Sequence, residues 1–147
     1  MEHRHQLTAL VLDANVIQAG TAFAADFAGR GGQHVVAQCR RQVVDAATQG
    51  HGTCHGGFLF ALADSAFAFA CNSYDEATVA LGCSIDYVAP ALCGDLLTAT
   101  ASEQSRKGRT GLYDVRIENQ RGELIALFHG KSYKVRGTVL AQEKQDD

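Results

Sequence analysis

The first third of the chain carries one clear helical pattern and one weak strand pattern. Apolar residues recur at helical spacing between Leu7 and Ile17, and Gly20 follows as a stop signal. The glycine-rich stretch 28–33 predicts a turn. Residues 34–47 hold short β-branched patches among polar residues, which indicate a strand only weakly. We therefore expect an N-terminal amphipathic helix and then a poorly marked strand.

The middle of the chain is dominated by one apolar run. Residues 58–71 contain only two polar side chains, Asp64 and Ser65, among alanines, leucines and phenylalanines. These residue types favour a helix over a strand, and the run is shorter than the ~20 residues that a membrane span requires. A helix that is apolar on all sides is a buried one, so we expect this helix to be buried.

After this helix the apolar residues alternate with polar ones, which predicts strands. Tyr113, Val115 and Ile117, for example, alternate with charged residues. The expected strands, separated by turns at Gly94-Asp95 and at residues 119–122, cover residues 78–88, 96–104, 111–118 and 123–135. A helix followed by a meander of three or four strands predicts an α+β architecture, with the helix lying on a twisted antiparallel sheet.

Composition narrows the class of protein further. The chain has 147 residues, of which 46% are hydrophobic and 20% charged, with a net charge of −3. These values predict a single globular domain over residues 1–147 and exclude a disordered, collagen-like or coiled-coil protein. The mild acidity argues against a general nucleic-acid binder, which is usually basic.

The placement of charge is uneven. There is no Lys or Arg from Gly50 to Glu103, whereas residues 104–136 hold eight basic residues against three acidic ones. One interpretation is chance combined with a buried middle segment. The other is an uncharged central element beside a basic surface that holds an anionic ligand.

The five cysteines do not form a recognisable disulfide or zinc pattern. Their number is odd, no CxxC pair occurs, and no signal-peptide pattern precedes them. We expect reduced thiols in a cytoplasmic protein. A zinc site would need closer ligand spacing, so no metal is expected, and Cys54-His55 is the one possible metal pair.

Asp64 is the residue of the apolar run that needs an explanation, because an ionised carboxylate inside an apolar helix is costly unless it is paired. Either the helix turns Asp64 toward solvent or a basic partner, or Asp64 is a base or nucleophile whose pKa is raised by burial. It follows His55-Gly56-Gly57 by about two helical turns. Free N–H groups at such a helix start can polarise a carbonyl oxygen while the carboxylate directs water, which is hydrolysis of an acyl group.

Several segments of the sequence share a pattern with one known family. They are residues 50–57 (GHGTCHGG), 62–68 (LADSAFA), 70–73 (ACNS), 84–90 (SIDYVAP), 94–95 (GD), 111–115 (GLYDV) and 130–132 (GKS). Over residues 49–137 the chain resembles the phenylacetate-pathway thioesterases of the hot-dog superfamily. Upstream of Gln49 the resemblance fails, so we expect an N-terminal part that is divergent or altered in reading frame.

The resemblance implies a fold and an activity. The implied fold is the α+β hot-dog fold, in which a curved antiparallel sheet wraps around one long central helix. Chains pair into homodimers, and these into homotetramers, with active sites at the subunit interface. The implied activity is hydrolysis of hydroxyphenylacetyl-CoA or related aryl-acyl-CoA thioesters in aerobic phenylacetate degradation, without a cofactor.

The resemblance also assigns roles to residues of this chain. Asp64 matches the catalytic carboxylate, acting as a general base on water or as a nucleophile that forms a mixed anhydride. Gly56 matches the residue whose backbone N–H polarises the thioester carbonyl, and Gly57 and His55 support the turn. Gln49 stands where this branch usually carries Asn, and its amide would orient water or hold the thioester.

An acyl-CoA substrate gives the basic segment a role. Lys107, Arg109 and Arg136 are the candidates for binding the CoA phosphates. Two other functions stay open: a non-catalytic acyl-CoA-binding hot-dog protein, and a hot-dog hydratase. A hydratase needs a catalytic histidine paired with a carboxylate across the interface, which His55 followed by two glycines fits less well. No nucleic-acid or membrane partner is expected.

Overall fold

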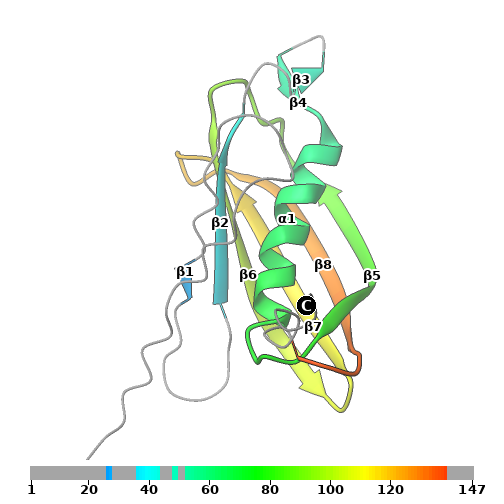
Figure 1. Ribbon diagram of the computed structural model, residues 1–147. Helices are drawn as coiled ribbons and strands as arrows, with labels where there is room; N and C mark the ends of the chain where they lie inside the picture. The colour runs from blue at the N-terminus through cyan, green and yellow to red at the C-terminus, as the bar shows by residue number, and fades with distance from the viewer. Residues whose placement is uncertain (1–25, 28–35, 44–47, 50–51, 139–147) are drawn as a thin grey trace, which may run out of the picture.

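The computed structural model describes residues 26–27, 36–43, 48–49 and 52–138 (Figure 1). Its elements, in chain order, are β1 (Asp26–Phe27), β2 (Val36–Gln42), β3 (Thr48–Gln49), β4 (Thr53–Cys54), α1 (Gly56–Cys71), β5 (Thr78–Tyr87), β6 (Leu96–Lys107), β7 (Thr110–Glu118) and β8 (Leu124–Lys134). The predicted helix near residues 7–17 and the turn at 28–33 lie outside the described residues. The weakly indicated strand within 34–47 is present as β2, and the four later strands are confirmed.

Six strands form one antiparallel sheet with α1 against one face, and β3 and β4 pair separately as a two-stranded sheet (Figure 1). The strand order is β1-β2-β6-β7-β8-β5, so β6, β7 and β8 form a meander of three strands. The alternative of a four-stranded meander is wrong, because β5 pairs with β8 and lies at the far edge of the sheet. The chain crosses from that edge to β6, which pairs with both β2 and β7. The result is an α+β architecture, as predicted.

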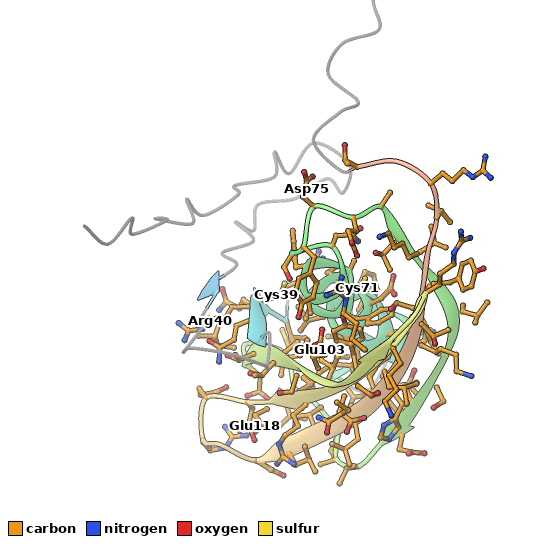
Figure 2. The ribbon with its side chains drawn as sticks, turned by 90° about the horizontal axis from the view of Figure 1, so that it is seen from below. Cys39, Arg40, Cys71, Asp75, Glu103 and Glu118 are labelled. Atoms are coloured by element: carbon orange, nitrogen blue, oxygen red, sulfur yellow. The ribbon has the colours of Figure 1, made fainter. Side chains whose placement is uncertain are left out.

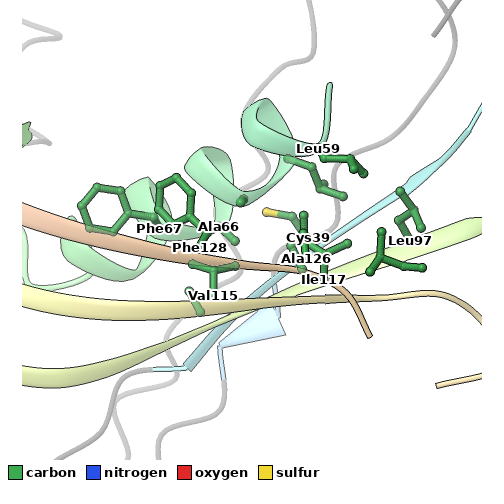
Figure 3. Close-up of a cluster of buried hydrophobic side chains, with 14 of the residues drawn as sticks. Cys39, Leu59, Ala66, Phe67, Leu97, Val115, Ile117, Ala126 and Phe128 are labelled. Atoms are coloured by element: carbon green, nitrogen blue, oxygen red, sulfur yellow. The ribbon is translucent and has the colours of Figure 1, made fainter. Parts of the chain in front are cut away.

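The core lies between α1 and the sheet (Figure 3). Phe67 on the helix packs against Phe128 and Tyr113 on the sheet, with ring centroids 5.8 and 5.4 Å apart. A Cβ atom at Gly130 would lie 2.7 Å from the Phe67 ring, so β8 needs a glycine there for the ring to reach the sheet. The alternation predicted for β7 holds, since Val115 and Ile117 are fully buried.

The prediction that the apolar helix is buried on all sides is wrong for the single chain. One face is buried against the sheet, through Leu59, Leu62, Ala63, Ala66, Phe67, Ala70 and Cys71. The other face is open: Phe58 is 38% exposed, Ala68 is exposed, and Ala61 and Asp64 are half-buried between them. The helix is therefore apolar on two faces but covered by the sheet on only one.

Candidate active site

The start of α1 is organised by the side chain of His55. This residue is the N-cap, and its Nδ1 accepts the backbone N–H of Gly57 at 2.9 Å. Its carbonyl oxygen accepts the N–H of Phe58 at 3.0 Å. The N–H of Gly56 has no hydrogen-bond partner among the described residues. One backbone donor at the positive end of the helix dipole is therefore available to a ligand.

Tyr87, the last residue of β5, closes the other side of this turn. Its hydroxyl donates to the carbonyl oxygen of Gly56 at 3.0 Å. A Cβ atom at Gly56 would lie 2.8 Å from Cζ of the Tyr87 ring, so any larger residue there would displace that ring. Tyr87 was not among the predicted site residues, because the alternation of apolar and polar residues does not distinguish the last residue of β5 from its neighbours.

A cleft of about 630 Å³ opens at the start of the helix. It is lined by Thr53, Cys54, His55, Gly56, Gly57, Leu59, Tyr87, Val88, Ala89, Pro90 and Ala91. The N–H of Cys54 donates to the carbonyl of Ala91 at 2.7 Å, which joins the two walls. None of the lining residues is an acid, a lysine or an arginine, so the cleft suits an uncharged group such as a thioester with an apolar acyl chain.

Asp64 lies further along the same helix. It is half-buried, and it makes no hydrogen bond or ion pair with any residue that the structure describes. Burial raises the pKa of Asp64 above the usual aspartate value. The described residues therefore include no basic partner for Asp64. The other explanation is a base, and a carboxylate whose pKa is raised by burial is an effective proton acceptor near neutral pH.

Gly56 and Asp64 of one chain are too far apart to act on one carbon atom. Asp64 follows Gly56 by eight residues, which places it about 12 Å further along the helix axis. A reacting carbonyl must lie about 3 Å from each group. Within one chain the structure therefore does not bring the two principal candidates together.

The other candidates near the helix occupy clear positions. Gln49 lies in β3, where its backbone pairs with Thr53 of the cleft wall. The hydroxyl of Ser65 donates to the carbonyl of Ala61 at 2.8 Å, so it is used within the helix itself. Cys71, near Asp64, is buried, and burial raises its pKa to about 12, so it is not a thiolate nucleophile at neutral pH.

The basic candidates lie at the opposite end of the sheet from the cleft. Lys107 and Arg109 flank the β6–β7 turn, and the N–H of Lys134 donates to the carbonyl of Arg109 at 2.7 Å. Lys134 pairs with Thr78 at the start of β5, whereas Gly56 contacts the end of this strand. The ten residues of β5 separate the two ends by about 30 Å. Lys107, Arg109 and Arg136 are exposed there, away from the helix start of their own chain.

A second polar cluster, which the sequence analysis did not identify, connects the end of α1 to the sheet. The buried carboxylate of Glu103 accepts the hydroxyls of Tyr113 at 2.8 Å and Tyr74 at 3.0 Å. Figure 2 shows Glu103 and Cys71 between the helix and the sheet. The guanidinium of Arg106 lies 3.7 Å from the centroid of the Tyr74 ring. This cluster holds the 72–77 connection in place and offers no open cavity for a substrate.

The described residues contain neither a cluster of metal ligands nor a membrane-spanning helix. Within this part of the chain, no three or more His, Cys, Asp or Glu side chains are grouped so that they could hold a metal ion. No helix among these residues is long and apolar enough to cross a membrane.

Known proteins share this sequence and arrangement. The profile of the Thioesterase superfamily matches residues 51–126. The acyl-coenzyme A thioesterase PaaI of Escherichia coli is 50% identical over 93 residues, which are 63% of this chain and 66% of PaaI. This chain therefore spans slightly less than two thirds of that relative's length.

Solved structures extend the comparison to the fold. The structure of the E. coli PaaI protein from the phenylacetic acid degradation operon has a TM-score of 0.68 and 44% identity, covering 78% of this chain and 81% of that one. A hypothetical thioesterase from Streptococcus pneumoniae, solved with coenzyme A, has a TM-score of 0.66 and 26% identity, covering 78% of this chain and 87% of that one.

A central helix packed on an antiparallel sheet is consistent with the hot-dog fold. The chain belongs to the thioesterase superfamily, and its sequence resembles the phenylacetate-degradation branch of that superfamily. The family and fold predicted from the sequence are confirmed.

Proposed function

We propose that the chain is an acyl-CoA thioesterase that hydrolyses hydroxyphenylacetyl-CoA or related aryl-acyl-CoA thioesters in phenylacetate degradation. The observation that carries the proposal is the unpartnered Gly56 N–H at the mouth of an uncharged cleft, together with the unpaired, half-buried Asp64. The similarity to PaaI supports the activity and the substrate class.

The chemistry follows from these groups. The thioester carbonyl oxygen accepts the Gly56 N–H, which stabilises the negative charge that develops there during attack. Asp64 removes a proton from water as the oxygen adds to the carbonyl carbon, or attacks that carbon itself to form an anhydride that water then opens. In both cases the C–S bond breaks, the CoA thiolate leaves and is protonated, and the free acid remains. The amide of Gln49 orients the water or the thioester.

A complete site requires a second copy of the chain, because Gly56 and Asp64 of one chain lie about 12 Å apart along the helix. The edge strand β5 is the surface for this pairing, since its exposed apolar side chains include Val79 at 49% and Leu81 at 58%, and Val88, at 55%, follows directly after it. Antiparallel pairing of β5 with its copy sets the Gly56 end of one helix opposite Asp64 of the other. The open face of α1 is then covered by the second chain.

The same two-fold pairing gives the basic residues a role. It brings the end of the sheet that carries Lys107, Arg109 and Arg136 in one chain to the cleft end of the other. The phosphates of CoA are bound there, as anionic groups on a basic rim. Such homodimers pair again into homotetramers. The S. pneumoniae thioesterase, which was solved with coenzyme A, supports CoA as the common part of the substrate.

Compartment and domain organisation complete the proposal. None of the five cysteines, which all lie among the described residues, forms a disulfide. Unpaired thiols suit a reducing compartment, so the protein is cytoplasmic. The chain forms one hot-dog domain over residues 1–147.

The test is release of free thiol from a panel of aromatic and aliphatic acyl-CoA thioesters. The wild-type protein should release CoA fastest from hydroxyphenylacetyl-CoA, and Asp64→Asn should lower kcat at least about a thousandfold while binding a non-hydrolysable CoA thioether normally. Ser65→Ala is the matched control, because its hydroxyl bonds only within the helix. Binding of acyl-CoA without thiol release by the wild-type protein would favour the non-catalytic alternative.

A further inference from the structure

The oxyanion donor of this site sits in the most flexible backbone of the helix. Gly56 and Gly57 are consecutive, and each glycine loses about 1 kcal/mol more conformational freedom than alanine when it is fixed in a helix. A hydrogen-bond donor stabilises a developing oxyanion well only if it is already aligned before the reaction. The Phe58 N–H bond to the His55 carbonyl, at 3.0 Å, holds one side of the peptide that carries this donor, and further groups hold the peptide that follows it.

The peptide group that joins the two glycines is held on both sides by side chains. Its N–H, that of Gly57, donates to Nδ1 of His55 at 2.9 Å. Its carbonyl, that of Gly56, accepts the hydroxyl of Tyr87 at 3.0 Å. With both ends of this peptide bonded, the plane of the preceding peptide, which carries the free Gly56 N–H, is restricted as well.

The two restraints come from different parts of the fold. His55 belongs to the same turn and moves with it. Tyr87 belongs to the sheet, and the residues after it are fixed, since the N–H groups of Val88 and Ala89 both donate to the carbonyl of Ile125, at 2.8 and 3.2 Å. The Tyr87 ring also packs on Gly56 so closely that a Cβ atom there would lie 2.8 Å from it. Tyr87 is thus the link between the helix start and the sheet.

We infer that Tyr87 is a positioning residue for the hydrolysis, an inference that rests on the thioesterase function proposed above. Its hydroxyl fixes the Gly56–Gly57 peptide, and its ring closes one side of Gly56. Together they keep the Gly56 N–H directed into the cleft, toward the thioester carbonyl oxygen. Tyr87 acts through Gly56 and transfers no proton.

The variant Tyr87→Phe separates the hydroxyl from the ring. Loss of one hydrogen bond should lower kcat about five- to tenfold and leave KM within about twofold, because the donor is needed most in the transition state. Tyr87→Ala, which also removes the ring, should lower kcat further. The matched control is Tyr133→Phe, since the Tyr133 hydroxyl bonds no described residue. It should behave as the wild-type protein.

A second measurement does not depend on activity. Amide hydrogen exchange of Gly57 should be about five- to tenfold faster in Tyr87→Phe than in the wild-type protein, while exchange in β7 stays unchanged. Wild-type kcat in Tyr87→Phe, or unchanged exchange at Gly57, would overturn the inference. If the wild-type protein releases no thiol, the hydrolase proposal fails instead, while faster Gly57 exchange in Tyr87→Phe still supports the positioning role.

Discussion

The carboxylate of Asp95 accepts the backbone N–H of Leu92 at 2.9 Å and so fixes the loop between β5 and β6. Its other oxygen accepts a hydrogen bond of 2.9 Å from Nε2 of Gln120, which lies in the turn between β7 and β8. The Asp95 side chain is only 6% exposed. The loop that it anchors supplies the cleft wall from Val88 to Ala91, so one buried carboxylate links the cleft wall to the β7–β8 turn at the same end of the sheet.

This arrangement predicts how stability depends on pH. The Leu92 N–H, and after it the Gln120 amide, lower the pKa of Asp95 below its usual value. A carboxyl whose pKa is lower in the folded state stabilises the fold above its unfolded pKa of about 3.9, and this contribution is lost as pH falls through the folded pKa. Asp95→Asn should therefore lower the free energy of unfolding by about 2 kcal/mol at pH 7.

Urea unfolding of both proteins at pH 7 and near pH 3 measures this effect. The difference between wild type and Asp95→Asn should become smaller at the lower pH, because the carboxyl of the unfolded chain binds a proton below its pKa of about 3.9 more readily than the folded carboxyl does. A difference that stays the same at both pH values would contradict the assigned role of the Asp95 charge.

The contact between Phe67 and Gly130 makes a core prediction. Gly130→Ala should lower the free energy of unfolding by about 1–3 kcal/mol, because the new methyl group would overlap the Phe67 ring. In the double variant with Phe67→Leu the two losses should not add, since the smaller side chain leaves room for the methyl group. Denaturant unfolding of the wild type, Gly130→Ala, Phe67→Leu and the double variant checks this. The contact would be refuted if the two losses of unfolding free energy added strictly.

Dimer formation through β5 is tested by a charge on that edge. Leu81→Arg replaces a side chain that is 58% exposed by a cation, and it should give a monomer without thioesterase activity. Leu112→Arg is the matched control, because Leu112 is 46% exposed on β7, which is inside the sheet and has no free edge. Light scattering after gel filtration gives the mass. An active monomer of Leu81→Arg would refute the shared site.

The proposed binding of the CoA phosphates by Arg109 and Arg136, the basic rim, is tested by measuring KM. Arg109→Gln and Arg136→Gln should each raise KM for acyl-CoA about two- to fivefold at low salt with little change in kcat, because they remove surface charge from the phosphate site. Added salt should reduce the difference. Arg116→Gln is the control, since Arg116 pairs with Glu118 on β7. Equal KM values in all three variants would show that the rim does not bind CoA.

Most of the fold could be predicted from local patterns, and the exceptions have physical causes. The alternation of Tyr113, Val115 and Ile117 fixes β7, and the 58–71 run predicts α1 to within two residues of its start. The position of β5 beside β8 could not be read from the sequence, because strand order depends on contacts between distant segments.

The site was predictable to the same degree. The spacing of Asp64 after the two glycines placed both groups on one helix, as the structure shows, and the profile that matches residues 51–126 is that of the thioesterase superfamily. The open face of α1 was missed because a pattern cannot tell whether an apolar face is covered by the same chain or by another. Tyr87 was missed because its contact with Gly56 joins residues 31 positions apart.

In the proposed dimer, the length of helix between Gly56 and Asp64 makes catalytic competence a property of a pair of chains. A chain carrying Asp64→Asn still offers an intact helix start, and one carrying Gly56→Ala still offers an intact carboxylate. If the two are unfolded and refolded together, each mixed dimer contains one whole site and one doubly defective site. Two inactive preparations should then recover about a quarter of the wild-type activity, since about half of randomly assorted dimers are mixed and each has one of its two sites. In a cell that carries both alleles, the two loss-of-function variants should likewise complement each other.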